Sequence, residues 1–163
     1  NKVGLFAEEI IYITVSDVQT MEEAYISWLL HDIGKVALLS LPEYPEEVFR
    51  LMDEKSIRYS LAEYELFGVS HAEVGAYFLA LWGLPESIIE AVYSHKKNEN
   101  LQFDYFNVAN AVYIANILGN IENFDLIKLK EMRMCGIPKE WLKYIEEISW
   151  DTSKFKIIFE NNL

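Results

Sequence analysis

Residues 70–96 read SHAEVGAYFLALWGLPESIIEAVYSHK, and they carry the clearest helical pattern in the chain. Ser70 and Glu73 have the spacing of a capping box, in which each side chain bonds the backbone of the other residue at a helix start. Apolar residues then recur three and four positions apart, as one face of a helix requires. Gly83 and Pro85 break this pattern, and proline suits the first turn of a new helix. Two helices are therefore predicted, at 71–82 and 86–95.

The same apolar spacing runs through nearly the whole chain, and no Asn-Gly or Asp-Gly hairpin signal separates alternating runs. Two more capping boxes, Thr20 with Glu23 and Ser60 with Glu63, predict further helix starts. The predicted fold class is therefore all-α, a compact multi-helix bundle. The remaining helices are predicted at 3–15, 21–31, 46–55, 61–67, 103–118, 125–132, 139–148 and 152–160.

Length and composition predict one ordered domain. The chain has 163 residues, of which 52% are hydrophobic, and no repeat or Gly/Ser linker divides it. We therefore expect a single helical domain over 1–163, with Trp28 and Trp82 in its core. Because the sequence starts at Asn1 inside an amphipathic pattern, we also expect a further segment upstream.

The charge balance excludes two classes of partner. Lys and Arg total 14 and Asp and Glu total 26, so the net charge is −12, which repels nucleic-acid phosphates and anionic membranes. We expect no nucleic-acid binding through a basic patch. We also expect no membrane association, since no apolar run approaches the roughly 20 residues of a membrane span. The lone Cys135 is expected in the core, and the first residues lack a signal-peptide pattern, which favours a cytoplasmic protein.

The three histidines each lie at or near the end of a predicted helix. His31 is followed by Asp32, so an imidazole and a carboxylate leave one helix end side by side, a pair that suits zinc, iron or manganese. His71 follows the cap Ser70, where the helix dipole disfavours a protonated ring. A polar role in the first helical turn is the alternative for His71. His95 ends its helix where the dipole favours protonation, and a capping or solvated role accounts for it equally well.

Three runs resemble the HDOD branch of the HD superfamily. They are LLHDIGKVAL at 29–38, the stretch 70–96 and ANAVYIAN at 109–116. Members of the superfamily are similar in being helical bundles whose enzymes hydrolyse phosphate esters with one or two divalent metals. The resemblance therefore implies a helical bundle with a metal site.

The ligand set that the resemblance implies is His31, Asp32, His71 and His95, for iron, manganese, zinc or magnesium. If the chain is active, the resemblance gives Asp32 and Lys35 the catalytic roles, with Lys35 near the mouth facing substrate phosphate. A surface lysine at a helix end is the alternative for Lys35.

Three departures from the family pattern weaken this ligand set. No histidine lies within residues 1–30, where the family's enzymes have a further ligand. Asn116 stands where the enzymes have Asp, and a neutral amide is a weaker ligand than a carboxylate. Lys96 follows His95 where cyclic-dinucleotide phosphodiesterases have a second His, and its charge opposes a nearby cation unless it points to solvent. We therefore expect a weak or absent metal, with Lys35 and Lys96 left to bind any phosphate ligand.

These departures favour a signalling role over catalysis. The first hypothesis is an HDOD-type output or scaffold domain with a degenerate metal site, which acts through contacts with a signalling protein or an upstream sensory or receiver domain. The alternative is a metal-dependent phosphohydrolase acting on a nucleotide or cyclic dinucleotide. A third hypothesis is a sensor that binds a nucleotide without cleaving it. A homodimer is compatible with each of them.

Overall fold

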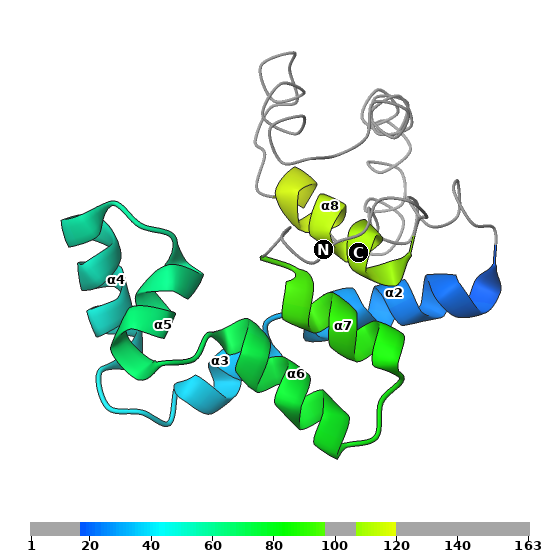
Figure 1. The fold of residues 1–163 in the computed structure, drawn as a ribbon, viewed down its shortest axis with the longest axis horizontal. Coiled ribbons are helices and arrows are strands. Elements are labelled where there is room, and N and C mark those ends of the chain that lie inside the picture. Colours follow the sequence, from blue (N-terminus) through cyan, green and yellow to red (C-terminus); the bar gives the residue numbers. More distant parts are fainter. Residues whose placement is uncertain (1–16, 97–106, 120–163) are drawn as a thin grey trace, which may run out of the picture.

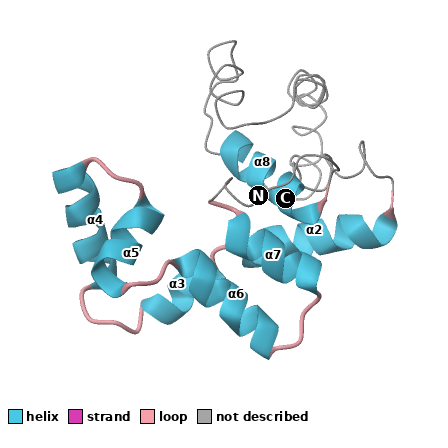
Figure 2. Cartoon of the chain, in the orientation of Figure 1, coloured by secondary structure: helices cyan, strands magenta, loops and turns pink. Residues whose placement is uncertain are grey.

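The structure, a computed structural model, describes residues 17–96 and 107–119, and every regular element in these ranges is a helix (Figures 1 and 2). The all-α prediction is therefore confirmed. The helices are α2 (Val18–Leu30), α3 (Ile33–Leu38), α4 (Tyr44–Lys55), α5 (Tyr59–Phe67), α6 (His71–Leu81), α7 (Glu86–Ser94) and α8 (Val108–Gly119). The predictions that lie outside the described residues are the helices 3–15, 125–132, 139–148 and 152–160, and Cys135.

The helices form a main body and a projecting hairpin. In the body, α7 packs against α2, α6 and α8, and α3 lies against α6. The α4–α5 hairpin stands to one side of the body, where it adjoins α3 and the start of α6 (Figure 1). Two apolar clusters match this division. The body cluster is centred on Leu79, Ile88 and Val92, and the hairpin cluster on Leu38, Tyr44, Val48 and Ala62. Burying each large apolar side chain contributes about 1.5–3 kcal/mol.

Two glycines allow α3 and α6 to approach each other closely. A Cβ atom added at Gly34 would lie 2.0 Å from the carbonyl oxygen of His71 and 2.7 Å from the backbone nitrogen of Gly75. A Cβ atom at Gly75 would lie 3.2 Å from the backbone nitrogen of Gly34. This approach of two backbones brings the residue before α3, Asp32, close to the first residue of α6, His71.

One of the three predicted capping boxes is confirmed. The Ser70 hydroxyl accepts a bond from the backbone N–H of Glu73, and the Glu73 carboxylate accepts one from the backbone N–H of Ser70. The box at Thr20 is wrong, because Asp17 caps α2 and accepts bonds from both the backbone and the hydroxyl of Thr20.

The capping box at Ser60 is also wrong. Helix α5 begins at Tyr59, two residues before the predicted start, and it has no side-chain cap. Glu63, the predicted partner of Ser60, is instead fully buried. An ionic side chain is buried only where hydrogen bonds replace its lost water, so Glu63 has a role other than capping.

Two further expectations differ from the structure. The segment 33–38 forms a separate short helix, α3, which the apolar pattern did not predict. Trp28 is buried, at 8% exposed, but Trp82 is 60% exposed at the end of α6, so only Trp28 belongs to the core. Among residues 17–96 and 107–119, no helix combines the length and the apolar character needed to cross a membrane.

Candidate metal centre

His31 and Asp32 form the turn between α2 and α3. His31 is the C-cap residue of α2, and its Nδ1 donates a hydrogen bond to the carbonyl oxygen of Trp28, 2.5 Å away. Asp32 precedes α3 and accepts a bond of 2.8 Å from Lys35 Nζ, one turn further along. The helix therefore ends before the pair, and the turn directs both side chains to the same side.

His71 and His95 reach the same place from the two helices of the 70–96 stretch. His71 is the first residue of α6 and His95 follows the last residue of α7, and both rings are fully buried. His71 Nδ1 lies 2.5 Å from Glu63 Oε2, and His95 Nδ1 lies 2.6 Å from the carbonyl oxygen of Val92. A solvated role for His95 is thereby excluded.

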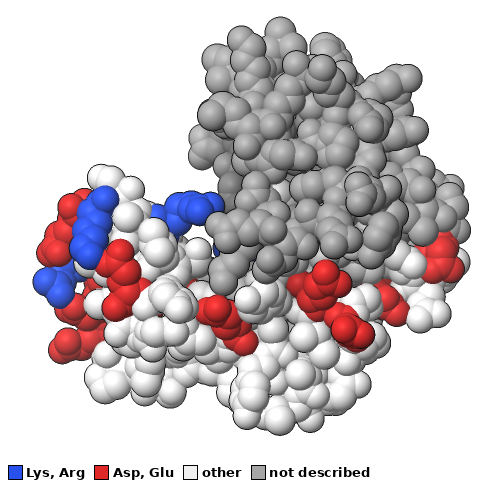
Figure 3. Space-filling view, in the orientation of Figure 1, with Lys and Arg blue, Asp and Glu red and all other residues white. Residues whose placement is uncertain are grey.

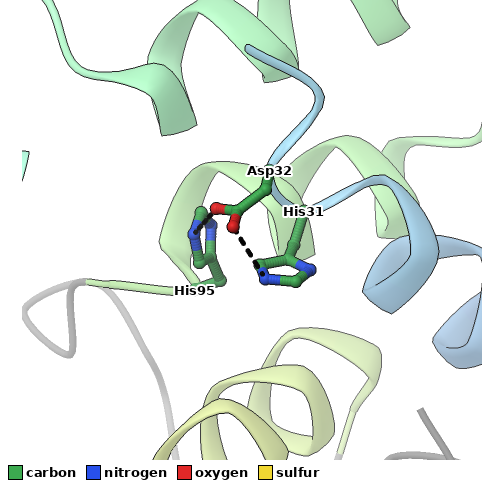
Figure 4. A group of neighbouring side chains, drawn as sticks. All are labelled: His31, Asp32 and His95. Carbon is green, nitrogen blue, oxygen red and sulfur yellow. Dashed lines mark ion pairs between the residues drawn. The ribbon is translucent and has the colours of Figure 1, made fainter. Parts of the chain in front are cut away.

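The four predicted donors converge on one point. The Oδ1 atom of Asp32 lies 3.3 Å from His71 Nε2 and 3.7 Å from His95 Nε2, and Asp32 Oδ2 lies 3.5 Å from His31 Nε2. The two Nε2 atoms of His71 and His95 are 3.3 Å apart. Figure 4 shows Asp32 between the rings of His31 and His95. The ligand atoms of His31, Asp32 and His95 all lie within 4.8 Å of one another. His71 lies beside this group rather than within it, with its Nε2 close to Asp32 and His95.

This arrangement fits a single divalent ion. Each ring uses Nδ1 toward an acceptor, so each Nε2 lone pair faces the common point, and two facing lone pairs require a shared proton or cation. Asp32 Oδ1 is buried and accepts no hydrogen bond of good geometry from the described residues. Three imidazole nitrogens and one carboxylate suit zinc, iron or manganese better than magnesium, which prefers oxygen ligands. The residues that would hold the ion are His31, Asp32, His71 and His95.

Burial and neighbouring charges determine the protonation of the site. Burial lowers the pKa of His95 to about 4 and also lowers that of His31. Burial acts in the same direction on His71, but Asp32 and Glu63 outweigh it and raise its pKa. For Asp32, burial opposes ionisation, yet His71, His95 and Lys35 hold its pKa well below the usual range. The expectations from helix dipoles alone were wrong for His71 and His95, because burial and full charges exceed the effect of a helix end.

Lys96 and Asn116 stand at the positions where the family's enzymes have a further His and an Asp ligand. Lys96 Nζ donates a hydrogen bond of 3.2 Å to Asn116 Oδ1, and Asn116 Nδ2 donates one of 3.2 Å to the carbonyl oxygen of His95. Burial lowers the pKa of the Lys96 ammonium, against the attraction of Asp32. The Lys96 side chain is therefore directed toward the site rather than to solvent, and the Asn116 oxygen accepts its hydrogen bond. An aspartate at 116 would lack the N–H group that the carbonyl of His95 accepts.

Lys35 lies at the edge of the site. Its side chain is 33% exposed, pairs with Asp32 and lies 5.1 Å from the ring centre of Tyr59. The expected role of Lys35 toward a substrate phosphate stays a prediction. In the space-filling view, charged side chains of both signs are visible on the hairpin, whereas the lower surface of the body is mostly uncharged (Figure 3).

The sequence interpretation missed Glu63 and Tyr44. Glu63 Oε2 accepts bonds from His71 Nδ1 and from the backbone N–H of His71, and its Oε1 accepts one from the Tyr44 hydroxyl. A signal was present, since Tyr59, Glu63 and Phe67 are spaced four residues apart on one face of a helix. A carboxylate in the middle of an aromatic face indicates a buried acceptor with a specific partner.

The helical fold and the His-Asp cluster define an HD-type helical domain. The family model of the HDOD domain matches residues 1–98. This match covers more than half of the 163 residues, and the chain therefore belongs to the HDOD family, as the runs at 29–38 and 70–96 predicted; the third run, at 109–116, lies beyond the matched residues.

Two similar sequences and one protein of similar fold are each longer than the part that this chain matches. An uncharacterized protein of Treponema pallidum (strain Nichols) is 29% identical over 119 residues, which are 71% of this chain and 23% of that protein. An HDOD domain protein of unknown function from Geobacter sulfurreducens is 28% identical, with a TM-score of 0.61 over 74% of this chain and 40% of its own. A proposed phosphohydrolase of Shewanella amazonensis SB2B has a similar fold, with a TM-score of 0.65 and 18% identity over 83% and 51% of the two chains. The chain thus spans well under two thirds of each relative.

Proposed function

We propose that this chain is an HDOD-type signalling domain that binds at most one divalent ion and acts through protein contacts rather than by hydrolysis. The observation that carries the proposal is the bond between Lys96 and Asn116. It places a positive charge and an amide where a second ion would need anionic donors.

The repulsion between Lys96 and a second cation supports the limit of one ion. The ammonium is attracted to Asp32, and its hydrogen bond to Asn116 holds it in place. Two unit charges about 4 Å apart repel by about 4 kcal/mol near a protein surface. A bound ion supplies Lewis-acid chemistry and lowers the pKa of its water, but a two-metal clamp on a phosphoryl group needs both ions.

An exposed apolar surface on α6 supports action through protein contacts. Tyr77 and Leu81 lie four residues apart on α6 and are each 63% exposed, and Trp82 at the end of the helix is 60% exposed. The Trp82 ring stacks on Phe78 at 6.0 Å between ring centres. Clustered exposed aromatic residues are typical of surfaces that bind another protein. We propose a signalling protein or a sensory or receiver domain as the partner.

A metal-dependent phosphohydrolase is the second candidate function. The convergence of His31, Asp32, His71 and His95 favours it, because side chains pointing apart would have excluded it. Lys35 at the edge of the site offers a cation to a phosphate of a nucleotide or cyclic dinucleotide. A sensor that binds a nucleotide without cleaving it would use the same kind of contact, between phosphate and the ammonium groups of Lys35 and Lys96.

The deciding experiment measures metal content and hydrolysis on the same sample. The chain is purified, loaded with zinc, iron or manganese, and analysed for bound metal, then incubated with p-nitrophenyl phosphate esters and a cyclic dinucleotide. We expect about one ion per chain and no turnover above that of the Asp32→Asn variant. Two ions per chain, or turnover that Asp32→Asn abolishes, would establish the phosphohydrolase instead. Calorimetry with the cyclic dinucleotide in the same buffer tests the sensor.

A further inference from the structure

We propose that Glu63 is a positioning residue of the candidate metal centre, and that through Tyr44 it couples the α4–α5 hairpin to metal binding. This inference rests on the one-ion site proposed above, and it assigns a function to a buried carboxylate that lies outside the expected ligand set. Three groups carry it: the Glu63 carboxylate, the His71 ring and the Tyr44 hydroxyl.

The Glu63 carboxylate fixes which nitrogen of His71 carries a proton. Both oxygens of the Glu63 carboxylate face donors, since Oε2 accepts the backbone N–H of His71 and Oε1 accepts the Tyr44 hydroxyl. An ionised carboxylate only accepts hydrogen bonds, so His71 Nδ1 must carry hydrogen, and Nε2 is the nitrogen left to bind a cation. The second bond, from the His71 backbone N–H at 3.0 Å, holds the same carboxylate oxygen against the start of α6.

Metal-binding histidines generally have such a partner. A carboxylate on the far ring nitrogen orients the ring and makes the near nitrogen a stronger donor, and its removal lowers metal affinity about 10- to 100-fold. His31 and His95 use carbonyl oxygens for this purpose, those of Trp28 and Val92. Among the three described rings, His71 is therefore the one whose Nδ1 faces a carboxylate, which makes its Nε2 the strongest predicted donor.

The partner of His71 belongs to the hairpin, not to the body. Glu63 lies on α5, and its other oxygen accepts a bond from Tyr44, the first residue of α4. The Tyr44 hydroxyl in turn accepts a bond of 3.2 Å from the Tyr59 hydroxyl, and the Tyr59 ring lies edge-on to His71 at 5.9 Å between ring centres. A change in the position of the hairpin thus alters the partner of His71, and a bound ion that fixes His71 restrains the hairpin.

Two measurements on the full chain test the role of Glu63. The first is zinc affinity, measured by competition with a chelator, for the wild type, Glu63→Gln, Tyr44→Phe and the control Glu65→Gln. Glu65 lies on the same helix but pairs with Lys55 at the surface. We expect affinity to fall about 10- to 100-fold in Glu63→Gln, by about threefold in Tyr44→Phe, where the carboxylate keeps its bond to His71, and not at all in Glu65→Gln.

The second measurement reads the His71 ring directly by ¹⁵N and ¹H NMR. We expect a downfield Nδ1–H resonance for His71 in the wild type and in Glu65→Gln, displaced upfield in Glu63→Gln. The wild-type spectrum does not depend on whether any variant folds. An unprotonated His71 Nδ1 in that spectrum would therefore overturn the inference by itself. A wild type that binds no zinc would overturn the one-ion site on which this inference rests while leaving a role through protein contacts intact, and the NMR result would still decide whether Glu63 holds the Nδ1 proton of His71.

Hydrogen exchange tests the coupling to the hairpin. We expect zinc to slow amide exchange in α4 and α5 of the wild type and of Glu65→Gln, and to have little effect there in Glu63→Gln. Equal protection of the hairpin in Glu63→Gln and the wild type would overturn the coupling. Unchanged zinc affinity in a folded Glu63→Gln variant would overturn the positioning role.

Discussion

The two ends of the candidate site are built from opposite kinds of group. The donor end consists of Asp32 and His71 with the supporting Glu63, and it presents lone pairs to a buried point. The cation end consists of Lys96 and Asn116, whose hydrogen bond holds an ammonium that is attracted to Asp32. The comparison teaches that a family motif can retain its donors at one end while the other end carries a positive charge and a neutral amide, groups that do not favour a second cation.

The most severe way to break the donor end is to separate α3 from α6. Gly34→Ala places a methyl group against the carbonyl oxygen of His71, where no flexible side chain can move aside. We expect a loss of about 3 kcal/mol in the free energy of unfolding, measured by urea denaturation. Gly68→Ala is the control. Its Cβ would meet no atom within 4 Å, so only its positive φ opposes it and the cost should be about 1 kcal/mol. Equal losses in the two variants would contradict the close approach.

Removing the charge of the donor end should abolish most metal binding without unfolding the chain. In Asp32→Asn the three rings and Lys35 lose their shared carboxylate, and we expect zinc affinity to fall about 100-fold. The same substitution at the exposed Asp53 of α4 should leave affinity unchanged. Competition with a chelator measures both, and wild-type affinity in Asp32→Asn would remove Asp32 from the ligand set.

Neutralising the cation end should have the opposite effect. Lys96→Met removes the repulsion near Asp32 while keeping side-chain length, and we expect zinc affinity to rise about 10-fold. Lys55→Met, which removes a lysine paired with Glu65 at the surface, is the matched control and should show no change. A fall in affinity in Lys96→Met would show that the lysine supports the ion rather than opposing it.

The mildest perturbation is pH, applied to the metal-free chain and followed by ring NMR signals. As pH falls we expect His71 to protonate first, because its pKa is raised, and His95 to stay neutral until about pH 4. The unfolded chain takes up the proton of His95 near pH 6.5. The contribution of His95 to stability is therefore complete above that pH and is lost as pH falls toward 4. Protonation of His95 before His71 would contradict its burial.

The sequence predicted the elements whose signals are local. The Ser70–Glu73 box and the Gly83–Pro85 turn are formed by neighbouring residues, and the structure places α6 and α7 within one residue of the predicted ends. The convergence of the four donors was implied by the family resemblance and not by spacing. The end of α2, the start of α6 and the end of α7 could be predicted from the sequence, whereas the start of α3 could not. That these ends lie together depends on how the helices cross.

The sequence failed where a tertiary contact overrides a local pattern. Ser60 and Glu63 have a capping spacing, but Glu63 gains two bonds from His71 and one from Tyr44, which outweigh a cap. The segment 33–38 is too short for a periodic signal, and its helix is held by contact with α6. Trp82 was placed in the core by its size, yet α6 ends there and the ring lies on its surface.

The close approach at Gly34 also limits how this domain can diverge. Because the nearest atoms to an added Cβ there are backbone atoms, a neighbouring side-chain substitution does not create space for a larger residue, so retaining this helix crossing favours retaining glycine at that position. Outward residues of the same two helices, such as Val36 and Tyr77, are under no such restriction. Paralogues can therefore acquire new binding specificities on their outer faces while the crossing itself is inherited unchanged.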